Sequence, residues 1–464
     1  MSTSSTPAPT TAGQQPELKR VLGPKLLLLF VVGDILGTGV YALTGQVAGE
    51  VGGAAWLPFL VAFAVATLTA LSYLELVTKY PQAAGAALYV HKAFGVQFLT
   101  FLVCFVVMSS GITSASAASR AFAANLAAGL GWAASDGAVL AVGLVFIGLV
   151  MAVNFRGVGE SVRLNVVLTL VELSGLLLVI GVGAWFLAGG EGDFSRAVAF
   201  ETPGDKSVLL AVSTATSLAF FAMVGFEDSV NMAEETRDPS RVFPRVMLTG
   251  LGLTAVVYVL VSICAVAVVP VGELRASETP LVEVVQTAAP GFPVSDLLPF
   301  ISMFAVANSA LINMMMASRL LYGMSRQGVL PPVLATVHPF RRTPWVSIVL
   351  TTAIAVALLA YVSLSPDSPV VAVLGGTTSL LLLTVFCAVN VSVLVLRRDR
   401  VGHGHFSAGR LAPVLGALSC AYLVLPWTSG RSLEQYRIAG LLLALGVVLW
   451  AVNHVAAQRR AAAR

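Results

Sequence analysis

Residues 31–45 read VVGDILGTGVYALTG, and this stretch decides the expected fold. It lies in an apolar run long enough to cross a bilayer, yet it contains Asp34 and the closely spaced Gly37 and Gly39. Each glycine weakens a helix by about 1 kcal/mol relative to alanine. Unwound backbone at membrane depth is tolerated only where protein buries it or where it lines a cavity. The stretch therefore predicts a broken membrane helix beside a site.

A second stretch has the same character. Residues 217–235 read SLAFFAMVGFEDSVNMAEE, with Gly225 shortly before two acids. The two stretches open two halves of five spans each, 24–189 and 207–397, and interruptions at corresponding places indicate a transporter site. The alternative, in which the glycines only allow helices to pack closely, stays open.

The composition excludes a soluble or disordered chain. Of 464 residues, 57% are hydrophobic and 11% are charged, against about 25% charged in soluble domains. The four cysteines lie in apolar runs and show no metal-ligand spacing. We therefore expect an all-α integral membrane protein, because no alternating strands of the kind that build membrane barrels occur.

Twelve apolar runs of about 18 residues or more are expected to span the membrane. They are 24–48, 54–78, 95–125, 137–155, 161–189, 207–234, 243–270, 296–325, 344–363, 369–397, 411–428 and 435–456. Residues 1–23 are expected to form a disordered cytoplasmic tail. Two further helices occupy 411–456, and 457–464 is a cytoplasmic C-terminus.

The cations set the orientation. With the N-terminus inside, 21 of the 27 Lys and Arg residues fall in inner segments. The six outer cations are Arg120, Arg196, Lys206, Arg275, Arg431 and Arg437. Because cytoplasmic loops are rich in Lys and Arg, this pattern favours both termini in the cytoplasm and argues against a nucleic-acid surface. Arg120 is expected to extend to the membrane interface.

Four stretches carry a family resemblance. They are GDILGTGVYALTG (33–45), SYLELVTKYPQAAGAALYVHKAFG (72–95), FFAMVGFEDSVNMAEETRDPSRVFPR (220–245) and ASRLLYGMSRQGVLPPVLATVHPFRRTPW (317–345). The chain resembles the amino acid–polyamine–organocation (APC) transporters, most closely their bacterial cationic-amino-acid-transporter-like branch. The resemblance covers about 24–397 well. It implies a LeuT-type fold of two inverted five-helix repeats, with helices 1 and 6 discontinuous and two peripheral helices.

The resemblance also implies a substrate site between helices 1, 3, 6 and 8. The turn of helix 1 would bind a carboxylate, backbone carbonyls would hold an amine, an aromatic ring at Phe221 would close the pocket, and Glu227 would sit behind the helix 6 break. The implied substrate-binding residues are Ile35, Leu36, Gly37, Thr38, Gly39, Phe220, Phe221, Val224, Gly225 and Glu227. Glu227 is favoured over Asp228, because adjacent helical residues point about 100° apart.

Acids inside the membrane are functional candidates, because each costs about 2.5–3.5 kcal/mol to insert. Asp34 lies in the first span and Glu172 in the fifth, where proton-coupled members of the resembled family usually carry lysine. We expect this pair to be the coupling site, sharing one proton or jointly holding sodium. In the alternatives, Glu172 only hydrogen-bonds a nearby backbone group and Asp34 is hydrated. The resemblance implies that Asn308 and Ser309 complete a sodium site.

These observations favour a secondary active amino acid transporter of the plasma membrane, working by alternating access and either ion-coupled or an exchanger. The alternatives are a transporter of an amine or polyamine without a carboxylate, or a solute sensor of the same fold. No catalytic motif occurs, so an enzyme is not expected. No cofactor or metal site is expected either; His403 and His405 are interpreted as solvated, and the coupling ion would be H⁺ or Na⁺. The expected partners are a small-molecule substrate and the lipid bilayer, and the oligomeric state stays open.

Overall fold

The structure, a computed structural model, describes residues 23–82, 85–156, 161–204, 206–365 and 369–462. The predicted tail 1–23 therefore lies almost wholly outside the described residues, as do the last two residues of 457–464. The helices are α1 (Pro24–Ile35), α2 (Thr38–Val51), α3 (Trp56–Lys79), α4 (Gly85–Phe94), α5 (Gln97–Gly129), α6 (Asp136–Arg156), α7 (Ser161–Ala188), α8 (Val208–Ala219), α9 (Pro239–Val268), α10 (Val271–Ala276), α11 (Pro280–Ala288), α12 (Pro293–Arg326), α13 (Trp345–Ser363), α14 (Val370–Leu396), α15 (Leu411–Val424), α16 (Pro426–Ser429) and α17 (Leu433–Ala462).

Short 3₁₀ helices complete the fold: η1 (Gly53–Ala55), η2 (Phe194–Val198), η3 (Phe220–Met223), η4 (Asp228–Glu235) and η5 (Pro332–Ala335). No β-strand occurs in the described part of the chain, where Gly52 and Phe200 form an isolated bridge. The all-α prediction is confirmed.

Eleven segments of the described residues are long and apolar enough to cross a bilayer, one fewer than the twelve predicted spans. The difference lies at 411–428, where α15 has 14 residues. The helix ends at Val424, and Leu425 after it is extended (φ −69°, ψ 134°). Pro426 follows, and a proline disfavours helical backbone at the preceding residue. At 1.5 Å per residue, α15 alone is shorter than the hydrocarbon core.

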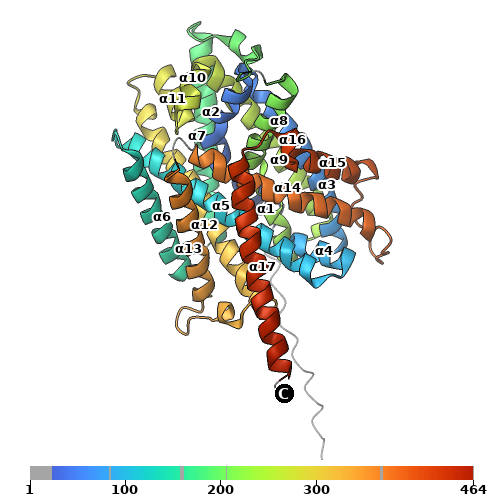
Figure 1. The fold of residues 1–464 in the computed structure, drawn as a ribbon. Helices are drawn as coiled ribbons and strands as arrows, with labels where there is room; N and C mark the ends of the chain where they lie inside the picture. The colour runs from blue at the N-terminus through green and yellow to red at the C-terminus, as the bar shows by residue number, and fades with distance from the viewer. Residues whose placement is uncertain (1–22, 83–84, 157–160, 205, 366–368, 463–464) are drawn as a thin grey trace, which may run out of the picture.

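The helices fall into two packed groups. In one, α1 and α3 pack on α9, and α2 packs on α8. In the other, α5 packs on α6 and α12, and α13 packs on α5, α6 and α12. The long helices α7 and α14 contact both groups. Figure 1 shows α6 and α13 at one edge of the molecule and α15 at the opposite edge.

Short helices occupy segments that the sequence analysis left as loops. The segment 271–295, predicted to lie outside, holds α10 and α11, which lie together at the end of the molecule opposite the C-terminus (Figure 1). The segment after α3, predicted to lie inside, holds α4. Both sets pack on membrane helices, α10 on α2 and α4 on α14, so they close the ends of the helical bundle.

Arg120 was expected to extend to the membrane interface. The protein encloses it instead: the residue is 3% exposed in the second half of α5. The guanidinium pairs with Glu278, in the connection between α10 and α11, at 2.5 Å and with Asp136 of α6 at 2.9 Å. These two carboxylates, supplied by neighbouring segments, offset the cost of removing the guanidinium charge from water.

Candidate functional site

The first predicted interruption is present. Helix α1 ends at Ile35, Leu36 and Gly37 are extended, and α2 begins at Thr38. The first N–H groups of any helix lack partners within it. No side chain caps α2 at Gly37, so these groups stay directed toward the gap between α1 and α2. The break therefore offers backbone donors and a positive helix end.

The second interruption is also present. Helix α8 passes into η3, then Val224 is extended (φ −72°, ψ 144°) and Gly225 has φ 126°. A residue with a side chain rarely adopts this φ, so the position calls for glycine. Glu227 Oε2 accepts the N–H of Gly225 at 2.9 Å. This hydrogen bond gives the backbone N–H of Gly225 a partner and so stabilises the break.

Glycines allow the two breaks to touch. A β-carbon on Gly225 would lie 2.5 Å from the carbonyl oxygen of Asp34, and one on Gly39 would overlap the backbone of Ala222. The glycines therefore do allow close packing, which was the alternative left open by the sequence. This packing brings the two unwound segments into backbone contact, so the glycines serve both packing and formation of the site.

A central cavity lies where these breaks face α5 and α12. Its lining consists of Asp34, Ile35, Gly37, Thr38, Gly39, Ser114, Phe221, Val224, Gly225, Asp228, Ser309 and Asn313. Both packed helix groups contribute. Its volume is about 30 Å³, which is room for one or two water molecules. The helices must move apart to admit a larger solute.

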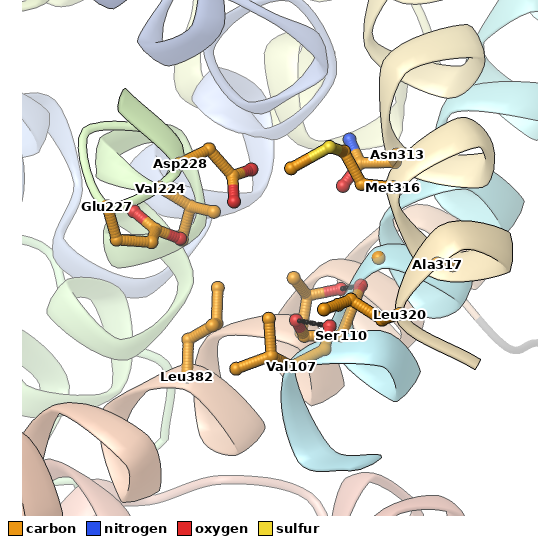
Figure 2. Close-up of a pocket in the computed structure, with 12 residues that line it drawn as sticks. Val107, Ser110, Val224, Glu227, Asp228, Asn313, Met316, Ala317, Leu320 and Leu382 are labelled. Carbon is orange, nitrogen blue, oxygen red and sulfur yellow. Dashed lines mark hydrogen bonds between the residues drawn. The ribbon is translucent and has the colours of Figure 1, made fainter. Parts of the chain in front are cut away.

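A second cavity, of about 20 Å³, continues from the first and shares Val224, Asp228 and Asn313 with it. Figure 2 shows Val224 and Asp228 on one wall and Asn313 and Met316 of α12 across from them. This cavity extends along α5 from Gly111 toward Val107, which is the direction predicted to lead to the cytoplasm.

Asp228 lines both cavities, whereas Glu227 lines only the second. The sequence analysis favoured Glu227 alone because it assumed a regular helix, in which neighbours diverge. The chain here is a turn followed by 3₁₀ helix, so both acids face the same space. An acid three residues after the helix-breaking Gly225 was the available signal for Asp228.

The cavities carry carboxylates and no cation. Neither lining contains Lys or Arg, whereas Asp34, Glu227 and Asp228 all contribute. Asp34 Oδ2 and Thr38 Oγ1 are buried without a hydrogen-bond partner. Because unpartnered buried polar atoms are costly, these two mark where a ligand's polar groups fit.

Glu172 lies behind this region on α7 and is fully buried. Neither carboxylate oxygen has a hydrogen-bond partner, so the alternative in which the side chain bonds a backbone group is not observed. Its backbone carbonyl accepts the hydroxyl of Tyr41 at 2.7 Å. Asp34 lies on α1, which packs on α7, although Glu172 lines neither cavity.

Some of the remaining predicted site residues line the cavities and others do not. Ser309 lines the central cavity, and its Oγ would lie 2.6 Å from a β-carbon on Gly37. Leu36, Phe220 and Asn308 are buried but line neither cavity. The carbonyl of Ile35 accepts the hydroxyl of Tyr258 at 2.8 Å, a contact that the sequence analysis did not foresee.

Known proteins match this chain over nearly its whole length. A family model described as amino acid permease matches residues 22–450. The branched-chain amino acid permease BcaP of Bacillus subtilis (strain 168) is 26% identical over 434 residues, 89% of each chain. The methylthioribose transporter of the same strain is 29% identical over 408 residues, 82% of each chain. Cationic amino acid transporter 9, chloroplastic, of Arabidopsis thaliana is 30% identical over 355 residues, 72% of this chain and 60% of that protein.

The family model covers both broken helices and both groups that line the cavities. The relatives' names describe transporters, in agreement with the eleven apolar spans of the described residues. The chain therefore belongs to the amino acid permease family, within the APC superfamily, and is a multi-pass membrane transporter of amino acids rather than an enzyme.

Proposed function

We propose that this permease moves its substrate across the plasma membrane by alternating access, with both termini in the cytoplasm. The observation that carries the proposal is the central cavity, which lies at the contact of two broken helices and between two packed helix groups. Rocking one group against the other would expose such a site to each side in turn. The cation distribution supports the orientation.

Within this cavity, the substrate carboxylate would bind at the start of α2. The Thr38 hydroxyl, which has no partner, and the first N–H groups of α2 supply donors there. The substrate ammonium would lie between Asp34 and Asp228, with Ser309 and Asn313 opposite. Phe221, buried against Gly375, would cover the bound solute.

The side chain of the substrate would extend into the second cavity. Its wall is mostly apolar and includes Val107, Met316, Leu320 and Leu382. Glu227 and Asp228 add negative charge at its entrance. Relatives named for branched-chain and for cationic amino acids are both compatible with this mixture.

For coupling, the proposal assigns Asp34 and Glu172 a shared proton or a sodium ion. Two carboxyl groups on packed helices, each with a buried oxygen that has no hydrogen-bond partner, are costly when both are charged. A proton or a cation removes that cost. Ser309 and Asn308 would contribute to a sodium site, whereas proton coupling needs only the two acids.

A second candidate, an amine or polyamine without a carboxylate, is favoured by the three carboxylates and the absence of a cation in the cavity linings. The two candidates differ at α2. An amino acid uses the start of α2, whereas an amine has no group to place there.

Transport assays with purified protein in proteoliposomes distinguish the amino acid candidate from the amine candidate. Uptake of radiolabelled leucine and lysine should be competed by other amino acids and weakly by putrescine or by methylthioribose. Repeating the assay with an inward proton gradient, then with a sodium gradient, identifies the coupling ion. Uptake competed by putrescine but by no amino acid would overturn the leading proposal.

A further inference from the structure

A third cavity, which shares no lining residue with the central site, lies on another face of the same stretch of α12. Its volume is about 430 Å³, within the range of small-molecule pockets. Its lining comes from the end of α6, the inner half of α12, and the segment that leads into α13. These residues are Asn154, Arg156, Met315, Ser318, Arg319, Arg341, Arg342, Thr343, Pro344 and Ile348.

Specific contacts hold the segment before α13 in place. Thr343 Oγ1 donates to the carbonyl of Phe155 on α6 at 3.1 Å, and the Phe155 ring lies edge-on to His338, 5.1 Å away. The N–H of His338 donates to the carbonyl of Thr343, and the N–H of Arg342 donates to the carbonyl of His338, which closes a tight turn. Arg342 has φ 54°, a strained value for a residue with a side chain. The turn therefore places the backbone of both arginines, Arg341 and Arg342, beside the cavity.

Four arginines line this cavity, and no acid lines it. None of the four forms an ion pair within the described part of the chain. Asn154 adds a side chain that is 5% exposed; its amide N–H groups can donate to an anion, whereas its unpartnered Oδ1 is an acceptor. The positive-inside rule explains cations on this side of the membrane. It does not require arginines from positions 156, 319 and 341–342 to face one pocket.

We propose that this pocket binds a phosphate-bearing anion. Like charges held together repel, and a ligand with two or more negative oxygens removes that repulsion. Arginine is suited to the role because its planar fork donates two parallel hydrogen bonds to phosphate oxygens. The site is distinct from the amino acid site, and its existence does not depend on how transport is coupled.

Two sources supply this chemistry on the cytoplasmic side. One is the headgroup of an anionic phospholipid, since basic pockets between membrane helices on that side bind such headgroups. The other is a soluble phosphorylated compound. In either case the ligand would contact α12 at Met315 and Ser318, which alternate along the helix with Asn313 and Met316 of the central cavities. Occupancy would therefore restrain the helix that forms one wall of the transport site.

Binding is tested with Arg319→Gln/Arg341→Gln and a matched control, Arg398→Gln/Arg400→Gln. All four arginines are exposed and on the same predicted side, and only the first pair lines the pocket. In the soluble arm, pyrophosphate is titrated into detergent-purified protein and thermal unfolding is followed. In the lipid arm, the protein is placed in nanodiscs of phosphatidylcholine with or without 20% phosphatidylglycerol, and bound lipid is counted by native mass spectrometry.

We expect a ligand-dependent rise in melting temperature, or retained phosphatidylglycerol, in the native protein and the control. The pocket pair should weaken binding about 25-fold, on the basis of about fivefold for each Arg near an anionic group. Without ligand, the pocket variant should be no less stable than the native protein, because repulsion is relieved. A response in one arm identifies the source, and a response in both confirms the shared chemistry. No response in either arm, or equal loss in the control pair, overturns the proposal.

Discussion

Gly225 sits against the backbone of Asp34, and a β-carbon at Gly225 would lie 2.5 Å from the Asp34 carbonyl oxygen. Real β-carbons do not approach this closely, and the φ of 126° at Gly225 adds strain for any other residue. Gly225→Ala should therefore separate the two breaks and reduce the uptake rate at least tenfold. Proteoliposome uptake measures the loss, and size-exclusion chromatography checks the fold.

The control for this prediction is Gly252→Ala in α9. A β-carbon there meets nothing within 4 Å, and alanine favours a helix. Gly252→Ala should transport normally and be equally or more stable. Normal uptake by Gly225→Ala would contradict the idea that contact between the breaks builds the site.

Thr38 tests the carboxylate end of the site. Its hydroxyl is buried at the start of α2 without a partner, and Thr38→Val removes it with little change in shape. Loss of a hydrogen bond to a charged group costs about 1.5–3 kcal/mol, so the KM for an amino acid should rise about tenfold or more. Protein without substrate should be no less stable, because an unsatisfied group is gone.

Thr44→Val is the matched variant, two turns further along α2. The Thr44 hydroxyl donates only to the carbonyl of Val40, at 2.6 Å, and Thr44 lines neither central cavity. Its KM should be unchanged. Equal effects of the two substitutions would place the substrate carboxylate elsewhere.

The sequence predicted the breaks because glycine spacing and acids in an apolar run are local signals. It also predicted Phe221, Val224 and Ser309 at the cavity through a family resemblance. It did not predict that Asp228 faces both cavities, since that follows from the turn and 3₁₀ geometry after Gly225. The two long-range hydroxyl contacts to the carbonyls of Ile35 and Glu172 depend on the packing of helices distant in the chain, which no local pattern records.

Glu172 tests the coupling proposal. If a proton shared with Asp34 drives uptake, Glu172→Gln fixes the side chain in a neutral form. Uptake by the native protein should rise as external pH falls from 8 to 6, whereas uptake by the variant should change little over that range. Counterflow exchange, which needs no net proton movement, should persist. A variant with the native pH profile would exclude Glu172 from coupling.

Arg120 and Glu278 test how the outer side opens. Their ion pair joins α5 to the connection between α10 and α11, and α10 packs on α2. If this cover must lift for a solute to enter, Glu278→Gln should favour the outward-open arrangement. A cysteine placed at Ser114, in the central cavity lining, should then react several-fold faster with a membrane-impermeant thiol reagent added outside. Labelling is compared with protein that lacks the added cysteine, because the chain has four of its own.

Asp136→Asn is the control. It removes the other partner of Arg120, but that carboxylate is 91% exposed and belongs to α6, which packs beside α5. Exposed pairs contribute little, so this variant should label at the native rate. Equal labelling of all three proteins would show that the Arg120–Glu278 pair does not hold the outer side closed.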